Sequence, residues 1–295
     1  MIASARWRAA PARPRPFFLW LFLPSLAAAL LFVAALCEVA QYAFRVFTPG
    51  SLEAGGFTLE NFARLARPIY LSVLADTLLI SLATALFTLL LSYPVAYAMV
   101  RAKSDFVRSL IMLLAVTPLF TGEIVRTYAW ILVLGSNGFV NSVLKAAGLV
   151  NAPLTMLYTR FGVIVALVQF SMPVMIIILA AALAHVDRNC ERAAANLGAG
   201  PAKVFRHVTL PLTLPGIVSG TVVIFAWTMS AFSTPQLVGG GKVLMISNLV
   251  YLQGLSSFNF PFAAVLSLLA LAVAIGALGS MRPFVSRLER KAAVN

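Results

Sequence analysis

Six long apolar blocks constrain this chain more than any other feature of its sequence. A run of about 20 apolar residues is long enough to cross a bilayer as an α-helix. With 61% hydrophobic and 11% charged residues, the 295-residue chain is also far too apolar for a water-soluble domain. We therefore predict an all-α polytopic membrane protein with six transmembrane helices. The predicted spans cover residues 17–44, 70–100, 109–134, 161–183, 215–233 and 262–280.

The basic residues indicate how these spans are oriented. A net charge of +13 could suggest a nucleic-acid partner, but Lys and Arg occur in short clusters between the apolar blocks and not on one soluble face. Four lie before residue 17, three at 101–108, four at 186–211 and four after residue 280, against seven elsewhere. By the positive-inside rule both termini are cytoplasmic. We predict membrane lipid as the surroundings and no nucleic-acid partner.

The predicted organisation has three parts. A basic cytoplasmic N-terminus covers residues 1–16, a membrane domain covers residues 17–285, and a cytoplasmic tail covers residues 286–295. The first apolar block is long and has no convincing small-residue cleavage site, so we interpret it as a retained span and not as a signal peptide.

The third span is predicted to break near Thr117-Pro118. Pro118 and Gly122 weaken a continuous helix, and irregular backbone at membrane depth is tolerated mainly where it faces protein or a water-filled cavity. The residues after the break are expected to form a separate helical piece. Two short helices are expected outside the spans, over residues 57–65 and 141–147.

Residues 187–216 carry the polar segment that is predicted to fold as two short helices joined by a glycine turn. Asp187 is a suitable N-cap for the first helix, and Gly198 stands where that helix should end. Pro201 can start the second helix, which Thr209-Leu210-Pro211 is expected to close. Because small side chains let another backbone come close, the first helix is predicted to dock into a partner. Its small apolar face consists of Cys190, Ala193, Ala194 and Leu197.

The same segment resembles a known signature. Glu191-Arg192-Ala193-Ala194, then Gly198, then Val208-Thr209-Leu210-Pro211 are similar to the EAA signature of permease subunits of binding-protein-dependent ABC importers. The resemblance implies a cytoplasmic coupling helix, within residues 187–211, that is seated on an ATPase. The family usually has glutamate where this chain has Arg192, and Glu191 lies one residue earlier, so the residue that makes the charged contact is left open. The coupling residues implied are Glu191, Arg192, Ala193, Ala194, Gly198, Arg206, Leu210 and Pro211.

Further stretches extend the resemblance over most of the chain, and they are similar to the first permease subunit of spermidine/putrescine-type importers. The implied fold has six helices with a MetI-like five-helix core, in the bacterial inner membrane. The implied partners are a second permease subunit in a heterodimer, two ATPase subunits and a periplasmic solute-binding protein. The implied substrate is a polyamine, although similar importers carry aminophosphonates, opines or thiamine. The stretches are FTLENFARL, SYPVAYAMVRAK, PLFTGEIVRTYAWILVLGSNGFVN and STPQLVGGGK.

The sequence lacks a nucleotide-binding or catalytic motif, so we predict a non-catalytic permease. Gly239-Gly240-Gly241-Lys242 ends like a P-loop, but Gln236 stands at the first glycine position and Val243 replaces the residue that would bind magnesium. ATP and Mg²⁺ are therefore expected in the partner ATPase, with no cofactor in this chain. His185 and His207 lack metal-ligand spacing, so no metal site is expected.

Two intramembrane acids are candidates for a route that carries a cationic solute. Ionisable groups inside a membrane are costly and usually face a cavity or a partner. Asp76 lies about two turns into the second span, and Glu123 follows the break at Pro118. The alternatives are a water-exposed position for either acid, or an ion pair such as that of Glu123 with Arg126 at i, i+3 spacing.

Aromatic and hydroxyl side chains are further candidates for this route. Aromatic faces attract ammonium groups, but interfacial belts of Trp and Tyr are the commoner explanation in membrane proteins. Serine hydroxyls within spans often bond their own helix. The candidates are Tyr128, Trp130, Phe170, Trp227, Ser230 and Phe232.

Two other classes of function compete with an ABC permease. A secondary transporter or channel driven by an ion gradient would use Asp76 or Glu123 as a proton site, and it would leave the docking segment unexplained. A purely structural membrane subunit would have no substrate route.

Overall fold

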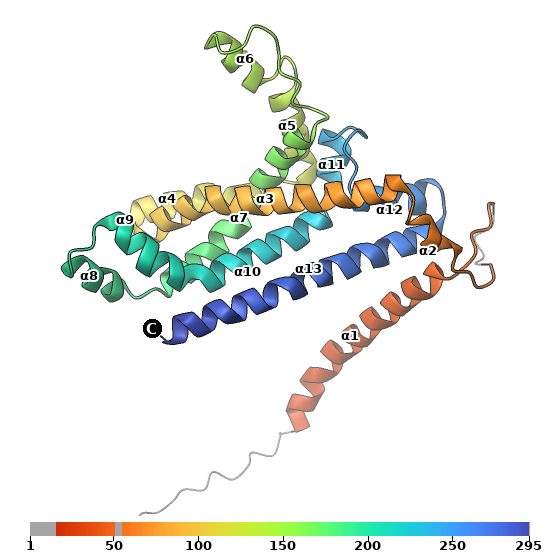
Figure 1. The fold of residues 1–295 in the computed structure, drawn as a ribbon, viewed down its shortest axis with the longest axis horizontal. Coiled ribbons are helices and arrows are strands. Elements are labelled where there is room, and N and C mark those ends of the chain that lie inside the picture. Colours follow the sequence, from red (N-terminus) through yellow and green to blue (C-terminus); the bar gives the residue numbers. More distant parts are fainter. Residues whose placement is uncertain (1–15, 51–54, 295) are drawn as a thin grey trace, which may run out of the picture.

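The computed structural model describes residues 16–50 and 55–294, and regular structure within these ranges is helical (Figure 1). The predicted N-terminal part, residues 1–16, lies outside the described residues except for Pro16, as does Asn295 of the predicted tail. Five of the described helices are long and apolar enough to cross a membrane, and a bent helix pair gives a sixth span if it is counted as one. The expected all-α membrane fold is therefore present in the described chain. Its long helices are α1 (Pro16–Ala43), α3 (Pro68–Arg101), α7 (Arg160–Ala184), α10 (Leu210–Met229) and α13 (Phe260–Val294).

Helices α3, α7 and α10 pack against one another and form the core of the bundle (Figure 1). Buried Met175, Leu179 and Ile224 fill the space between them. Two glycines of α10 allow the close approach: a Cβ on Gly220 would lie 2.6 Å from the Met175 sulfur, and one on Gly216 would collide with Ala182. Lipid is as apolar as these side chains, so close packing at small residues, and not the hydrophobic effect, holds such helices together.

A row of buried hydroxyl side chains lies along α3. Thr77 donates a hydrogen bond to the Val73 carbonyl at 2.7 Å and accepts one from the Ile246 N–H at 2.9 Å, which links α3 to the chain before α13. Small hydroxyl residues suit a helix interface inside a membrane because they permit close contact and can bond to backbone. The row consists of Thr77, Ser81, Thr84, Thr88 and Ser92.

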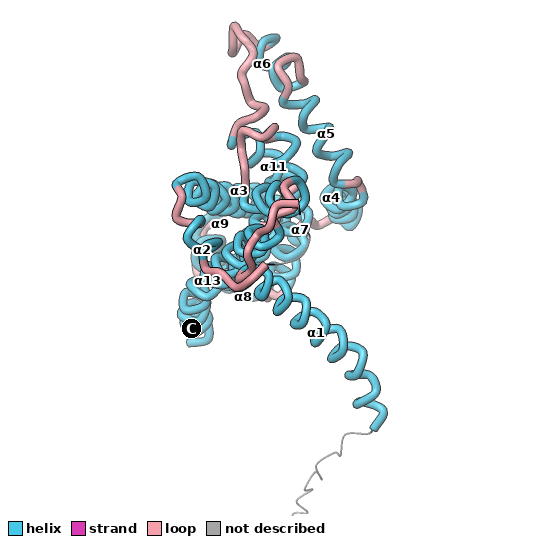
Figure 2. The backbone as a smooth tube through the Cα atoms, turned by 90° about the vertical axis from the view of Figure 1, so that its right-hand side faces the viewer, coloured by secondary structure: helices cyan, strands magenta, loops and turns pink. Residues whose placement is uncertain are grey.

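The third predicted span is broken, as expected at Pro118. Pro118 lies in a 3₁₀ turn, after which Thr121 adopts extended backbone and the next helix sets off at 103° to the first. The guanidinium of Arg126 donates to the carbonyls of Pro118 and Thr121, which satisfies acceptors that the break leaves free. The second arm therefore stands away from the bundle (Figure 1, Figure 2). The elements are α4 (Asp105–Val116), η1 (Thr117–Phe120), α5 (Glu123–Leu134) and α6 (Phe139–Ala146).

Helix α1 diverges from the bundle and reaches it only near its C-terminal end (Figure 1). There the buried Asn61 of α2 (Glu60–Arg64) donates to the carbonyls of Ala43 at 3.2 Å and Arg45 at 2.8 Å. These bonds fix the turn after α1. The short helix expected within residues 57–65 thus anchors the first span to the rest of the chain.

Short helices close the end of the bundle opposite the polar segment (Figure 1). The Asn248 side chain accepts a hydrogen bond from the Met245 N–H at 3.0 Å and donates to Gln236 at 2.9 Å. This buried amide ties the elements together. They are α11 (Ser233–Val238), α12 (Ile246–Tyr251) and η3 (Leu252–Ser256).

The polar segment contains the expected first helix and glycine turn, but its second helix does not end where expected. That helix runs on into α10, so the closure predicted at Thr209-Leu210-Pro211 is wrong, and the fifth long helix begins at Pro201 and not at residue 215. A proline inside an α-helix lacks an N–H and clashes with the carbonyl four residues back, and a wider π turn just before Pro211 relieves this clash. The elements are α8 (Arg188–Asn196), α9 (Pro201–Val204) and the π turn η2 (Phe205–Thr209).

Candidate coupling site and membrane cavity

Helix α8 projects from one end of the bundle (Figure 1). Asp187 caps its start by accepting a hydrogen bond from the Asn189 N–H at 2.9 Å. Gly198 follows its end with a φ of +85°, a conformation that strains any residue with a side chain. Leu197 is 90% exposed, and Cys190 and Ala193 are exposed beside it. The small apolar face of α8 therefore has no cover within the described chain.

Glu191 points into its own subunit. Its carboxylate forms an ion pair with the Arg101 guanidinium at 2.7 Å and accepts a hydrogen bond from the Thr209 hydroxyl at 2.8 Å. The two side chains of the ion pair are only 14% and 15% exposed. The acid thus fastens α8 to the end of α3 and to the helix that continues into α10.

Aromatic packing strengthens this attachment. The Phe205 ring meets Tyr93 at 5.6 Å and Tyr97 at 5.8 Å, each edge to face, and the Tyr93 hydroxyl bonds with the Thr213 hydroxyl at 2.9 Å. Sequence reasoning did not single out Arg101 or Tyr93, and it named Thr209 only as part of the signature and of the expected helix end. The only local signal was an arginine and aromatic residues at the end of the second span, because their partners lie about 90 to 120 positions further along the chain.

The other predicted coupling residues differ in how far their side chains are exposed. Arg192 and Arg206 are exposed on the surface of the segment, whereas Ala194, Leu210 and Pro211 are half-buried. Contact of this set with an ATPase stays a prediction, and Arg192 is the charged residue of the signature that is free to make it.

A cavity of about 170 Å³ lies between α5, α7 and the end of α10. The Phe170 and Trp227 rings meet edge to face across 5.4 Å at its wall. Five of the predicted route residues line this cavity together, and four further hydroxyl residues line it with them. The five are Glu123, Phe170, Trp227, Ser230 and Phe232, and the four are Ser171, Thr228, Ser233 and Thr234.

Three predicted route residues lie elsewhere. Asp76 pairs with Arg160 at 2.8 Å, which matches the ion-pair alternative for an intramembrane acid. Trp130 donates to Gln169 at 3.2 Å, and Tyr128 is 56% exposed on α5. Tyr128 and Trp130 belong to α5 but do not line the cavity, and Asp76 belongs to α3.

Arg126 already places one positive charge near the cavity. Its guanidinium lies 4.8 Å from the centre of the Phe170 ring, in a cation–π contact. It does not form the ion pair with Glu123 that was the alternative to a route role for that acid, because it is directed instead to the carbonyls at the helix break. The Ser230 hydroxyl donates to the Trp227 carbonyl at 2.8 Å, so it bonds its own helix.

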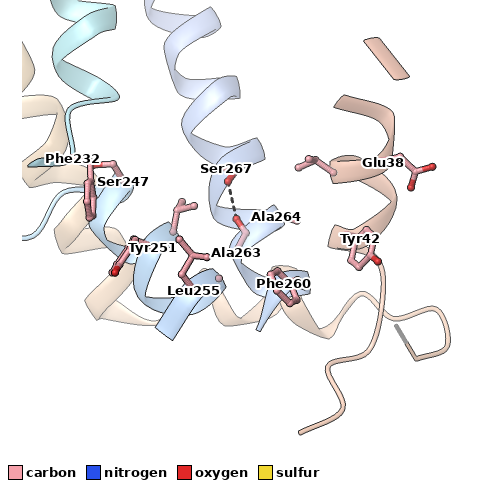
Figure 3. Close-up of a pocket in the computed structure, with 13 residues that line it drawn as sticks. Glu38, Tyr42, Phe232, Ser247, Tyr251, Leu255, Phe260, Ala263, Ala264 and Ser267 are labelled. Atoms are coloured by element: carbon pink, nitrogen blue, oxygen red, sulfur yellow. Dashed lines mark hydrogen bonds between the residues drawn. The ribbon is translucent and has the colours of Figure 1, made fainter. Parts of the chain in front are cut away.

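A second and larger cavity, of about 810 Å³, separates α1 from α12, η3 and α13 (Figure 3). Tyr42 borders it on the α1 side, and Leu255, Phe260 and Ala263 border it on the other. Its walls are largely apolar, and the Ser267 hydroxyl is occupied by a bond to the Ala263 carbonyl at 2.9 Å. This cavity therefore suits apolar contact with lipid or another helix better than it suits a polar solute.

Residues 89–290 match the family described as the binding-protein-dependent transport system inner membrane component. The matched range includes the polar segment and all residues that line the smaller cavity. The chain belongs to this family.

The permease is 35% identical over 72% of its length to the spermidine/putrescine transport system permease protein PotB of Haemophilus influenzae, of which 73% is covered. It is 32% identical to PotB of Escherichia coli K12, with 72% of this chain and 77% of that protein covered.

Another relative carries a different name. The molybdenum transport system permease protein ModB of Mycobacterium bovis is 32% identical, with 86% of the permease and 90% of ModB covered.

Solved structures share the fold. A bacterial ABC transporter involved in the import of alginate matches with a TM-score of 0.77 at 19% identity, over 92% of the permease and 96% of that chain. The MetNI methionine ABC transporter matches with a TM-score of 0.58 at 15% identity, over 75% of the permease and 99% of that chain. The family match and the PotB relatives confirm the resemblance to ABC permeases of the spermidine/putrescine type, and these structures show the shared fold.

Proposed function

We propose that this permease is the transmembrane subunit of an ATP-driven importer that passes a small cationic, polyamine-like solute from a periplasmic binding protein to the cytoplasm. The observation that carries the proposal is α8, whose small apolar face is exposed while Glu191 fastens it to the bundle. A second permease and two ATPase subunits complete the proposed complex in the bacterial inner membrane. The ATPase subunits bind ATP and Mg²⁺.

The attachment of α8 supports a mechanical role. Because η2 joins the segment to α10 without a break, and Glu191 joins it to α3, a push on α8 is passed directly to two helices of the core. ATP-driven closure of the ATPase pair moves α8 as a rigid body in this proposal, and the motion of α3, α7 and α10 opens the cavity to the periplasm.

The lining of the smaller cavity supports a cationic substrate. Relatives of similar identity are named for spermidine and putrescine and for molybdenum, so identity by itself does not choose the substrate. A carboxylate at Glu123 and the aromatic ring of Trp227 favour ammonium groups, while the Phe170 ring already holds the Arg126 guanidinium. Aminophosphonates, opines and thiamine remain alternative substrates, since each carries a nitrogen cation.

The second permease subunit is proposed to pack against α1 and the larger cavity. The large side chains of α1, such as Leu30, Leu31 and Phe32, are 61%, 72% and 65% exposed in the single chain. A helix that diverges from its own bundle gains contacts when a neighbour fills the space beside it.

Reconstitution tests the proposed function. The chain is coexpressed with candidate ATPase, second permease and binding protein, and spermidine uptake into proteoliposomes is measured with ATP and with a non-hydrolysable analogue. Uptake that requires ATP and all subunits is expected. Uptake by the purified chain alone under an ion gradient would identify a secondary transporter or channel instead.

Labelling of Cys190 tests the proposed orientation. Cys190 is exposed on α8, so a membrane-impermeant maleimide is expected to label it in inside-out vesicles and not in right-side-out ones. Bound ATPase is expected to reduce labelling close to the level of a Cys190→Ser control. Cys37, the other free cysteine, lies within α1 and is shielded from a water-soluble reagent by lipid. Labelling of Cys190 from the periplasmic side would contradict the proposed coupling role.

Glu123→Gln is expected to lower spermidine uptake by the complex about fivefold at low substrate, since a solvent-accessible charge pair contributes about 1 kcal/mol. The reason is loss of the carboxylate in the cavity. Glu60→Gln, on exposed α2, is the matched control because it removes the same charge away from the cavity. Equal uptake by the Glu123→Gln variant and the control would remove Glu123 from the route.

A further inference from the structure

A groove of about 650 Å³ opens beside the coupling helix, where the ends of α3, α4 and α7 meet the start of α8. Three arginines line it, one from each of three elements: Arg101 of α3, Arg108 of α4 and Arg188 of α8. Met112 lies four residues beyond Arg108, about 6 Å further along the axis of α4. Ala181 of α7 also lines the groove. The groove therefore combines basic groups at its outer end with apolar walls further in.

Much of the hydrogen-bonding capacity of these arginines is unused. Arg188 donates one bond to the Val100 carbonyl at 2.9 Å and forms no ion pair among the described residues. Arg108 has a loose pair with Asp105 at 3.7 Å, and both side chains are well exposed. Each guanidinium has five N–H donors in a planar fork, so both arginines retain donors for an incoming oxyanion.

The carboxylates near the groove are already engaged. Asp187, which also lines it, accepts the capping bond from Asn189, and Glu191 is paired with Arg101. The Nε of Arg101 is buried without an acceptor within the described chain. The lining holds three guanidinium groups and one carboxylate, and because Glu191 balances the charge of Arg101, the donors left for an anion are mainly those of Arg108 and Arg188.

We propose that this groove binds the phosphate headgroup of an anionic phospholipid. Guanidinium groups pair with phosphate through two parallel bonds, and basic pockets between membrane helices on the cytoplasmic side suit anionic headgroups. Met112, which lines the groove and is 56% exposed, provides an apolar contact for an acyl chain. A free phosphate would not use this contact, and an acidic peptide would match it poorly.

The lipid has a structural consequence. Its phosphate bridges Arg108 on α4 and Arg188 at the start of α8, so it adds a link between the broken third span and the coupling helix. The cytoplasmic placement of the groove rests on the proposed function, whereas the binding of lipid to the chain does not.

The experiment is native mass spectrometry of the full purified chain with added lipid. Phosphatidylglycerol is expected to remain bound in preference to zwitterionic phosphatidylethanolamine. The double variant Arg108→Gln with Arg188→Gln is expected to lower phosphatidylglycerol occupancy about tenfold or more. Lys103→Gln is the matched control, because Lys103 is an exposed cation in the same turn that does not line the groove. Arg101 is left intact so that its pair with Glu191 is preserved.

Four results would overturn the proposal. One is equal retention of the two lipids, and another is equal occupancy in the double variant and the Lys103→Gln control. The third is displacement of phosphatidylglycerol by millimolar inorganic phosphate, which would indicate a simple anion site. A double variant that keeps the lipid but loses an ATPase would assign the groove to a protein partner and refute lipid binding. A chain that binds the lipid but recruits no ATPase would refute the proposed function alone.

Discussion

Gly198→Leu is expected to abolish transport by the assembled complex while the chain still inserts into the membrane. Gly198 has a φ of +85° in the turn between α8 and α9, and a Cβ there would meet nothing within 4 Å. The cost is therefore backbone strain and not collision. A left-handed residue with a side chain costs about 1–2 kcal/mol, which lowers the ratio of native to non-native turn about 5- to 30-fold. ATP-dependent spermidine uptake measures the effect, and surface labelling of the vesicles measures insertion.

Two matched variants separate strain from bulk at this turn. Gly198→Asn is expected to retain most transport, because asparagine tolerates the left-handed conformation better than leucine. Gly200→Ala is expected to be nearly neutral, since Gly200 has a φ of −67° and open space around its Cβ position. Normal uptake by Gly198→Leu would show that the shape of this turn has no part in coupling.

Glu191→Ala is expected to destabilise the chain and to uncouple ATP hydrolysis from transport. The substitution leaves Arg101 unpaired at 14% exposure and removes the acceptor of the Thr209 hydroxyl. Breaking one side of a fully buried ion pair costs about 3–5 kcal/mol, and we expect about 2–4 kcal/mol here because both side chains retain some contact with water. The apparent Tm of the purified chain measures the first effect, and the ratio of ATP hydrolysed to solute transported measures the second.

Arg192→Ala is the matched control for stability, because Arg192 is the exposed neighbour of Glu191 on the same helix. Its apparent Tm is expected to stay near that of the wild type. The charge-swapped pair Glu191→Arg with Arg101→Glu is expected to recover part of the stability that either single change loses. A Glu191→Ala variant as stable as Arg192→Ala would mean that the ion pair does not hold α8 to α3.

Local sequence signals predicted several elements correctly. Pro118 disfavours a continuous helix wherever it stands in a long apolar block, and the broken third span follows from that. Asp187 and Gly198 bound α8 because capping and left-handed backbone depend on the residue itself and its immediate neighbours. The same local reasoning failed at Pro211, where a π turn allows the helix to pass through a proline that was expected to end it.

The hydropathy of the chain was enough to locate helices of membrane-spanning length, and its signature residues were enough to indicate the family, since both are read along the chain. Three-dimensional packing was needed to turn Glu191 inward to Arg101. Packing also brings Phe170, Trp227 and Glu123 together at one cavity. It places Asp76 in an ion pair with Arg160 instead. The physical reason is that the rotation of each helix about its own axis is set by close contacts with distant helices, such as those at Gly216 and Gly220. No spacing within a single apolar block records that rotation.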